Sequence, residues 1–233
     1  MSSIVTRLQE VKQRIEAASL RAGRDANKIT LLVVSKSHPV DAVRAAHAAG
    51  ARAFGENYVQ EALGKLASLA DGLRPPPEWH LIGPLQSNKA GEVAGHFQWV
   101  HTVDRLKLAE RLAARRPDGL PPVQLCLQVN ISAEPSKHGV APADACALAR
   151  AVAALPADRV RLRGLMAIPA PAAGFEAQRG PHRRLRELMQ AINAEAGLAL
   201  DTLSIGMSDD LEAAIAEGAT IVRVGSAIFG PRG

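Results

Sequence analysis

Residues 30–49 read TLLVVSKSHPVDAVRAAHAA, an apolar run that closes on Lys36 and leads into an alanine-rich amphipathic segment. The apolar run predicts a buried strand, and the spacing of apolar residues in Val40–Ala49 predicts a helix. A lysine at the end of a buried strand has two interpretations. Its ammonium reaches solvent while the stem packs, or burial lowers its pKa and makes a nucleophilic amine suited to a Schiff base.

The same strand-then-helix pattern continues along the chain. Strands are predicted at Thr30–Ser35, Ala51–Gly55, Glu78–Gly83, Phe97–Val103, Val123–Asn130, Arg161–Ile168, Thr202–Ile205 and Thr220–Val224. Helices are predicted at Ile4–Arg21, Val40–Ala49, Tyr58–Leu69, Lys89–Ala94, Arg105–Arg115, Pro142–Ala154, Pro181–Ala196 and Asp209–Glu217. Short βα units join parallel neighbours. Eight of them in 233 residues predict an α/β fold, a closed (β/α)8 TIM barrel with the first helix as an extra N-terminal element.

An open, doubly wound sheet is the alternative fold. No Gly-x-Gly-x-x-Gly follows the first strand, which argues against a dinucleotide-binding version of it. No stretch is rich enough in Gly, Pro or Ser to act as a linker, and 169–180 is expected to be a surface loop. We therefore expect residues 1–233 to form a single domain.

Composition narrows the possible surroundings and partners. No apolar stretch is long enough to span a membrane, the start of the chain lacks a secretory h-region, and the two cysteines suit a reducing compartment. We expect a cytoplasmic protein. The net charge of +5 favours a small anionic ligand. The basic run 179–186 is expected to be a solvated helix face, and with only seven aromatics no nucleic-acid partner is expected.

Polar and reactive residues gather where the predicted strands end. They are Lys36, Asn57, the segments 83–89 and 136–139 with Lys137, Met207-Ser208 and Gly225-Ser226. Barrel chemistry takes place at the carboxyl ends of the strands, so this asymmetry predicts the functional site there. Lys137 is expected either to be an exposed loop lysine or to form a second amine or anion site.

The last two strands predict a phosphate site. Ser208 is expected to cap a helix beginning at Asp209, with Asp209 and Asp210 in its first turn, and Gly225-Ser226 opens a last short helical turn. Strand alternation turns Arg223 into the barrel, where its guanidinium needs either a carboxylate from a neighbouring strand or a ligand atom as acceptor. Lysine, arginine and phosphate loops match the aldehyde, ring nitrogen and phosphate of pyridoxal 5′-phosphate (PLP).

Other chemistries are poorly supported. The histidines do not form a His-Glu-x-x-His frame, so no metal is expected. Neither a Gly-x-Ser-x-Gly elbow nor a Walker loop is present.

Several segments together resemble the pyridoxal phosphate homeostasis proteins, a family similar to the N-terminal barrel domain of alanine racemases (PLP fold type III). They are Val34–Lys36, Phe54–Glu61, Trp79–Lys89, Gly164–Pro169, Leu203–Ser208 and Val222–Gly230. The resemblance implies that Lys36 carries PLP as a Schiff base and that Arg223 faces the pyridine nitrogen. It also implies that Ser208, Gly225 and Ser226 hold the phosphate, that Met207 belongs to the cofactor-binding residues, and that Asn57 and His80 line the pocket.

Three functions remain open from the sequence. The favoured one is a non-catalytic carrier that buffers PLP or delivers it to PLP-dependent apoenzymes, expected to be a monomer. The second is a racemase-like enzyme with Lys36 as its only base, and the third is a class I aldolase without cofactor. Arginine cannot protonate the ring nitrogen, the only tyrosine is Tyr58, and the chain ends soon after the last strand, all of which favour the carrier.

Overall fold

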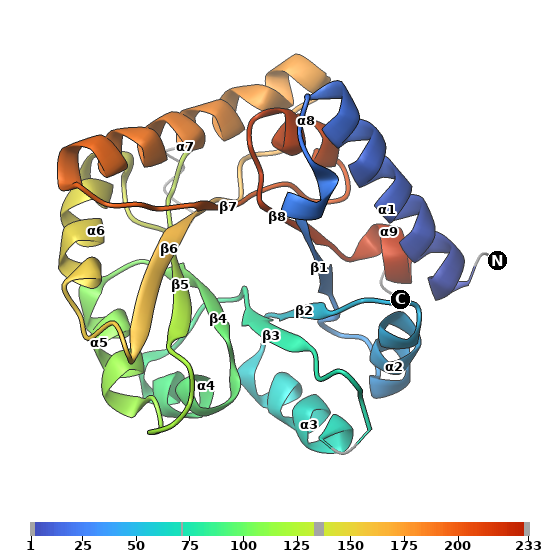
Figure 1. Ribbon diagram of the computed structural model, residues 1–233, viewed down its shortest axis with the longest axis horizontal. Helices are drawn as coiled ribbons and strands as arrows, with labels where there is room; N and C mark the ends of the chain where they lie inside the picture. Colours follow the sequence, from blue (N-terminus) through green and yellow to red (C-terminus); the bar gives the residue numbers. More distant parts are fainter. Residues whose placement is uncertain (1–2, 71, 133–137, 231–233) are drawn as a thin grey trace.

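Eight parallel strands close into a barrel in which each strand pairs with the next along the chain and β8 pairs with β1 (Figure 1). The computed structural model describes residues 3–70, 72–132 and 138–230. The strands are β1 (Thr30–Val34), β2 (Ala53–Glu56), β3 (Glu78–Leu81), β4 (Trp99–Val103), β5 (Val123–Gln128), β6 (Val160–Met166), β7 (Thr202–Ser204) and β8 (Ile221–Val224). The predicted (β/α)8 barrel is confirmed, and the open sheet is wrong.

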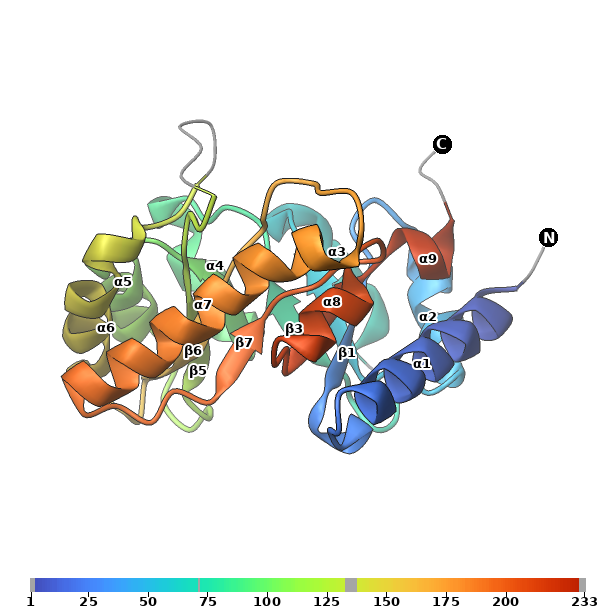
Figure 2. The same ribbon diagram turned by 90° about the horizontal axis from the view of Figure 1, so that it is seen from above.

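Helices surround the barrel on the outside (Figures 1 and 2). They are α1 (Ile4–Arg21), α2 (Val40–Ala48), α3 (Val59–Leu69), α4 (Ala90–His96), α5 (Leu106–Arg115), α6 (Ala145–Ala153), α7 (Phe175–Ala196), α8 (Leu211–Ala216) and α9 (Ser226–Phe229). Short 3-10 turns lie at Ala26–Lys28, Ser87–Lys89 and Pro142–Asp144. The extra helix α1 packs against α8, α9 and α2, beside the seam where β8 meets β1.

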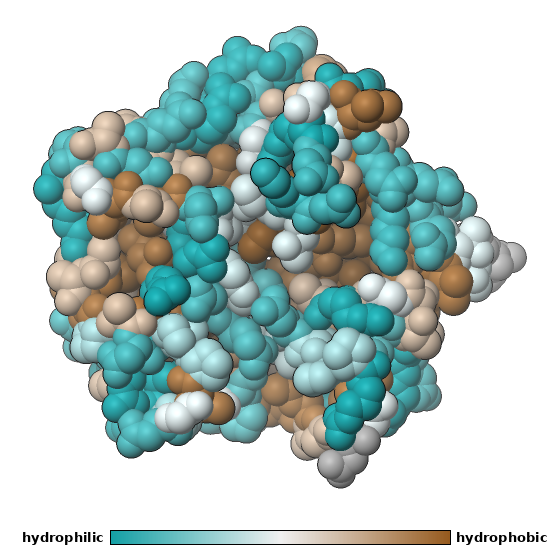
Figure 3. All heavy atoms as spheres, viewed as in Figure 1, coloured by the Kyte–Doolittle hydropathy of each residue, from teal (hydrophilic) through white to brown (hydrophobic). Residues whose placement is uncertain are grey.

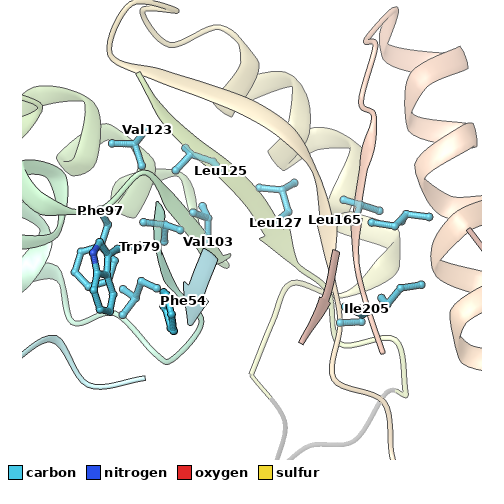
Figure 4. Close-up of a cluster of buried hydrophobic side chains, with 14 of the residues drawn as sticks. Phe54, Trp79, Phe97, Val103, Val123, Leu125, Leu127, Leu165 and Ile205 are labelled. Atoms are coloured by element: carbon cyan, nitrogen blue, oxygen red, sulfur yellow. The ribbon is translucent and has the colours of Figure 1, made fainter. Parts of the chain in front are cut away.

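Strand alternation builds two apolar layers. Val123, Leu125 and Leu127 lie on one face of β5 and join the large cluster between the barrel and its helices (Figure 4). Leu32 and Val34 of β1 point the other way, into a smaller cluster inside the barrel. The outer layer explains why the strand sequences are so apolar, because parallel strands are covered on both faces.

Among the helix boundaries that differ from the prediction, the starts of α7 and α8 matter most for the site. Helix α7 begins at Phe175, not at Pro181, so 175–180 is helical although it was expected to be loop. Proline commonly marks a helix start, but here it lies inside the helix, and Gly174, with a φ of +86° that favours glycine, precedes the first turn. Helix α8 begins at Leu211, after Asp210, so the two aspartates precede its first turn.

The basic run of α7 is not simply a solvated face. Arg179, Arg183 and Arg186 all donate hydrogen bonds to the buried carboxylate of Glu217, just after α8. Residues at these spacings share one side of a helix. The local sequence pattern gave no sign that Glu217, in another segment, is their partner. The run therefore joins α7 to α8.

The strands all run in one direction, so they begin at one end of the barrel and finish at the other. Figure 3 shows the end at which the strands begin, where hydrophilic residues gather around the centre of the face. The carboxyl ends of the strands lie at the opposite end. Across the three described ranges, no helix has both the length and the apolar character needed to cross a bilayer.

Candidate functional site

A cavity of about 210 Å³ opens at the carboxyl ends of the strands. The residues that line this cavity belong to β1, β2, β3, β6, β7 and β8 or to the loops that follow these strands. The lining residues are Val34, Lys36, His38, Asn57, Ile82, Ile168, Met207, Ser208, Asp209, Arg223, Gly225, Ser226 and Gly230. Seven of the eight site residues predicted from the sequence are in this set. Closure of the barrel brings the ends of the chain's first and last strands together, which no local pattern could show.

Lys36 is half-buried and follows β1 by two residues. The residues on either side of Lys36 are held in place by hydrogen bonds. Ser35 donates its hydroxyl to Glu56 Oε1 at 2.6 Å, and the amide of Ser37, a residue with φ of +62°, donates to Glu61 Oε1 at 2.6 Å. The lysine therefore stands on a short, fixed piece of backbone between two anchored serines.

A second lysine, Lys65 of α3, holds this arrangement together. Its ammonium, 5% exposed, donates to Ser35 O at 2.6 Å, Glu56 Oε1 at 2.7 Å and Glu61 Oε1 at 2.6 Å. Burial raises the pKa of the Glu56 carboxyl above its usual value, although hydrogen bonds from Lys65 and Ser35 oppose the shift. Sequence reasoning missed this cluster. The available signal was a charged residue on the apolar side of α3, three residues after the buried Ala62.

Arg223 lies at the floor of the cavity and is 4% exposed. One guanidinium nitrogen, Nη1, donates to the carbonyl oxygen of Ser204 and to its hydroxyl at 2.9 Å, and Nη2 donates to Ala167 O at 2.9 Å. The sequence had left open a carboxylate as the acceptor for this guanidinium. The structure gives it uncharged carbonyl and hydroxyl oxygens as acceptors instead. Burial lowers the pKa of Arg223 to about 10, so the group is still a cation at neutral pH.

The loops after β7 and β8 meet at two serine hydroxyls. Ser226 Oγ lies 3.1 Å from Ser208 Oγ, which also accepts from the amide of Ala227 at 3.4 Å. The expectation that Ser208 caps α8 is wrong, because its side chain reaches across to the start of α9. Both hydroxyls and the nearby Gly225 border the cavity, and this donor set suits an anion such as phosphate.

The loop after β7 is held from two other sides. Asp210 Oδ1 accepts from the amide of Met207 at 2.6 Å, and its second oxygen pairs with the buried His182 ring at 2.9 Å. Gly206 has φ of +89°, and a Cβ there would lie 2.5 Å from Ala214 Cβ. Only glycine fits this turn, which explains the Gly-Met-Ser sequence.

Asn57 lines the cavity as expected, and its backbone is packed against Gly83, where a Cβ would lie 2.2 Å from Asn57 O. His80 does not line the cavity, which corrects the expectation. Strand alternation places His80 and Ile82 on the same interior side, and Ile82, nearer the carboxyl end, closes over it. His38 and Asp209 border the cavity without having been predicted. Lys137 lies outside the described residues.

Comparison with known proteins agrees with this geometry. The family model for the alanine racemase N-terminal domain matches residues 6–233. An alanine racemase of Clostridium difficile superposes with a TM-score of 0.71 at 13% identity, covering 95% of this chain and 56% of the racemase, and so shares the fold. Together, the fold and the match define the class: a barrel of the alanine racemase N-terminal type.

Relatives with higher identity define the family more narrowly. A pyridoxal phosphate homeostasis protein of Pseudomonas aeruginosa is 60% identical over 232 residues, covering all of this chain and 97% of the relative. One from Escherichia coli is 50% identical over 237 residues, covering 100% and 98%. The structure of PipY from Synechococcus elongatus with PLP bound has a TM-score of 0.83 at 40% identity, covering 98% and 100%. The chain belongs to the pyridoxal phosphate homeostasis protein family.

Proposed function

We propose that residues 1–233 form one barrel domain that binds PLP reversibly and takes part in PLP homeostasis. The observation that carries the proposal is the sharing of one cavity by an amine, a guanidinium and a pair of serine hydroxyls. These groups match the aldehyde, ring nitrogen and phosphate of PLP, and relatives named for PLP homeostasis support it.

Each group has a separate role in the proposed site. The Nζ of Lys36 adds to the aldehyde carbon, and loss of one water leaves a carbon–nitrogen double bond, a Schiff base. Arg223 donates a hydrogen bond to the ring nitrogen. Ser208, Gly225 and Ser226 hold the phosphate, Met207 lines the cavity beside them, and Asn57 contributes a polar wall. PLP supplies an electrophilic aldehyde and an electron-withdrawing ring when bound.

The same site favours a protein that carries PLP without catalysing a reaction. A guanidinium has donors only and cannot deliver a full proton to the ring nitrogen, so the ring stays a weaker electron sink than one paired with an acid. Its pKa of about 10 keeps Arg223 charged under working conditions. We infer that the protein buffers the cofactor and delivers it to PLP-dependent apoenzymes.

The absorption spectrum of purified protein with added PLP tests the binding. We expect a visible Schiff-base band that borohydride removes, and a peptide with reduced pyridoxyl phosphate on Lys36 in mass spectrometry. Lys36→Ala should abolish the band, while Lys107→Ala, an exposed lysine of α5, should keep it. A band that survives in Lys36→Ala would show that another amine holds the cofactor.

Turnover is tested separately from binding. Exchange of the Cα hydrogen of L-amino acids in deuterium oxide, followed by NMR, detects racemase-like chemistry even when no net product forms. We expect no exchange above that of Lys36→Ala with free PLP. Exchange that depends on Lys36 would instead establish the enzyme alternative.

A further inference from the structure

A line of polar side chains crosses the interior of the barrel below the cavity. Arg223 Nη1 donates to Ser204 Oγ at 2.9 Å, Ser204 Oγ lies 2.8 Å from His101 Nδ1, and His101 Nε2 lies 2.9 Å from His80 Nδ1. His80 Nε2 then lies 3.6 Å from a carboxylate oxygen of Glu78. We call these five residues the barrel relay.

The relay spans the barrel from one end to the other. Arg223 borders the cavity at the carboxyl ends of the strands. Glu78, the first residue of β3, is 59% exposed and lines a hollow at the opposite end, the face seen in Figure 3. The residues between them are at most 1% exposed and come from β7, β4 and β3. Their polar atoms therefore depend on one another for partners, except His80 Nε2, which has no hydrogen-bond partner among the described residues.

The two charged ends determine the direction of the three hydrogen bonds that join Arg223, Ser204, His101 and His80. A guanidinium only donates, so Ser204 Oγ accepts from Arg223 and gives its own proton to His101 Nδ1. His101 must then carry its proton on Nε2, which donates to His80 Nδ1. His80 in turn carries its proton on Nε2, which lies 3.6 Å from the Glu78 carboxylate, beyond hydrogen-bond distance but close enough for electrostatic attraction.

The opposite arrangement fails at both ends. If His101 carried its proton on Nδ1, the Ser204 hydroxyl would receive two donors and its own proton would have no acceptor in this line. His80 would also present a lone pair to a negative carboxylate. The favoured arrangement leaves His80 Nε2–H outside hydrogen-bond distance but beside an opposite charge. The opposite arrangement leaves the Ser204 proton without an acceptor in the line and sets two electron-rich atoms against each other, which costs more free energy.

The rings stay neutral in this arrangement. Burial lowers the pKa of His80 against the opposing effect of Glu78, and burial together with the positive charge of Arg223 holds the pKa of His101 well below its usual value. The neighbouring His80 ring lowers the pKa of Glu78, which is therefore ionised at neutral pH. Arg223 stays a cation, so the relay runs from a positive end to a negative end.

We propose that Ser204, His101 and His80 are positioning residues that fix the guanidinium of Arg223 for its contact with the ring nitrogen, and that Glu78 sets their polarity from the far end of the barrel. The inference rests on the proposed function, since it concerns the same ring contact. It gives His80 a role through Arg223, in place of the direct pocket contact expected from the sequence.

The first test determines the tautomers of the two relay histidines in the absence of any ligand. Two-bond ¹⁵N–¹H correlation spectra of histidine-labelled, PLP-free protein distinguish the two neutral tautomers of each ring. We expect His80 and His101 both to be protonated on Nε2 at neutral pH. A proton on Nδ1 of His101, or a charged His101, would overturn the relay.

The second test measures coupling between the far end and the cavity. Glu78→Ala changes an exposed side chain outside the cavity, and Glu110→Ala, on exposed α5 surface, is the matched control. We expect Glu78→Ala to mix the tautomers of His80 and to weaken PLP binding roughly twofold or more, the range of coupling between linked sites. Equal PLP affinity in the two variants would overturn the positioning role.

A third comparison separates positioning from packing. Gln can accept from Ser204 and donate to His80, whereas Leu can do neither, so His101→Gln should restore most of the PLP affinity and the absorption maximum lost in His101→Leu. The loss should be roughly fivefold, equivalent to one hydrogen bond. Equal losses in both variants would contradict the proposal. A wild-type protein with the expected tautomers but no PLP binding would instead refute the proposed function.

Discussion

At the scale of single residues, Lys65 and Lys36 show that the position of a lysine in the sequence does not by itself predict how far it is buried. Lys36 stands out in the sequence because it closes an apolar run, yet it is half-buried and borders the cavity. Lys65 attracts no attention in the sequence and is 5% exposed. A buried ammonium is tolerated only when it is paired and fully hydrogen-bonded, and Lys65 meets that condition with three short contacts to oxygen.

Lys65→Met should destabilise the fold strongly. It leaves the Glu56 carboxylate buried with only the Ser35 hydroxyl as partner, and breaking a buried pair costs about 3–5 kcal/mol. Urea unfolding followed by circular dichroism measures the difference. Lys107→Met, on the exposed side of α5, is the control and should change stability by less than about 0.5 kcal/mol. Similar midpoints for both variants would show that the Lys65 cluster does not hold this region.

At the scale of elements, the packing of α7 on α8 depends on one carboxylate. Glu217 is fully buried and accepts from Arg179 Nε at 2.6 Å, Arg183 Nη2 at 3.0 Å and Arg186 Nη1 at 2.7 Å. Burial acts to raise the pKa of Glu217, but hydrogen bonds from Arg183 and Arg179 outweigh it and leave the pKa lowered. The carboxylate form is therefore the form that the folded state favours.

This lowered pKa gives a pH-dependent contribution to stability. Because the folded pKa lies below the unfolded value of about 4.3, the contribution is present above that pH and is lost as the pH falls through the folded pKa. Glu217→Gln should lower the urea midpoint at pH 7, and the gap to wild type should shrink below about pH 4. Glu110→Gln, an exposed glutamate, should show no such gap. A gap that does not change with pH would contradict the role of this charge.

At the scale of the whole molecule, the first helix is tied to the loop that follows the seventh strand. Arg14 of α1 donates to Glu212 through Nε at 2.8 Å and through Nη2 at 2.9 Å, and Nη2 also reaches Ser208 O at 2.9 Å. Nearly 200 residues of sequence separate these partners. The extra helix thus supports the loop that carries the proposed phosphate contact.

Arg14→Ala should therefore affect the phosphate end of the site selectively. We expect PLP affinity to fall about fivefold, the equivalent of one hydrogen bond, while affinity for pyridoxal, which lacks the phosphate, stays unchanged. Spectroscopic titration of both ligands measures this. Arg21→Ala, in the last turn of the same helix, is the control and should affect neither ligand. An equal loss for PLP and pyridoxal would mean that Arg14 supports the barrel generally and not the phosphate loop.

The sequence by itself determined the order of strands and helices, the end of the barrel that carries the site, and Lys36 and Arg223 as its two cations. These follow from hydrophobic periodicity and from polar residues placed after apolar runs, which are local properties of the chain. The resemblance to a known family added the ligand.

Only the tertiary structure decided what these residues touch. It moved His80 from the cavity wall into the barrel relay, gave the arginines of α7 a buried partner in Glu217, and turned Ser208 from α8 toward α9. The physical reason is that periodicity predicts which face of a strand or helix a residue occupies. Its partner across that face, often 20 to 200 residues away in the sequence, is fixed only when the barrel closes.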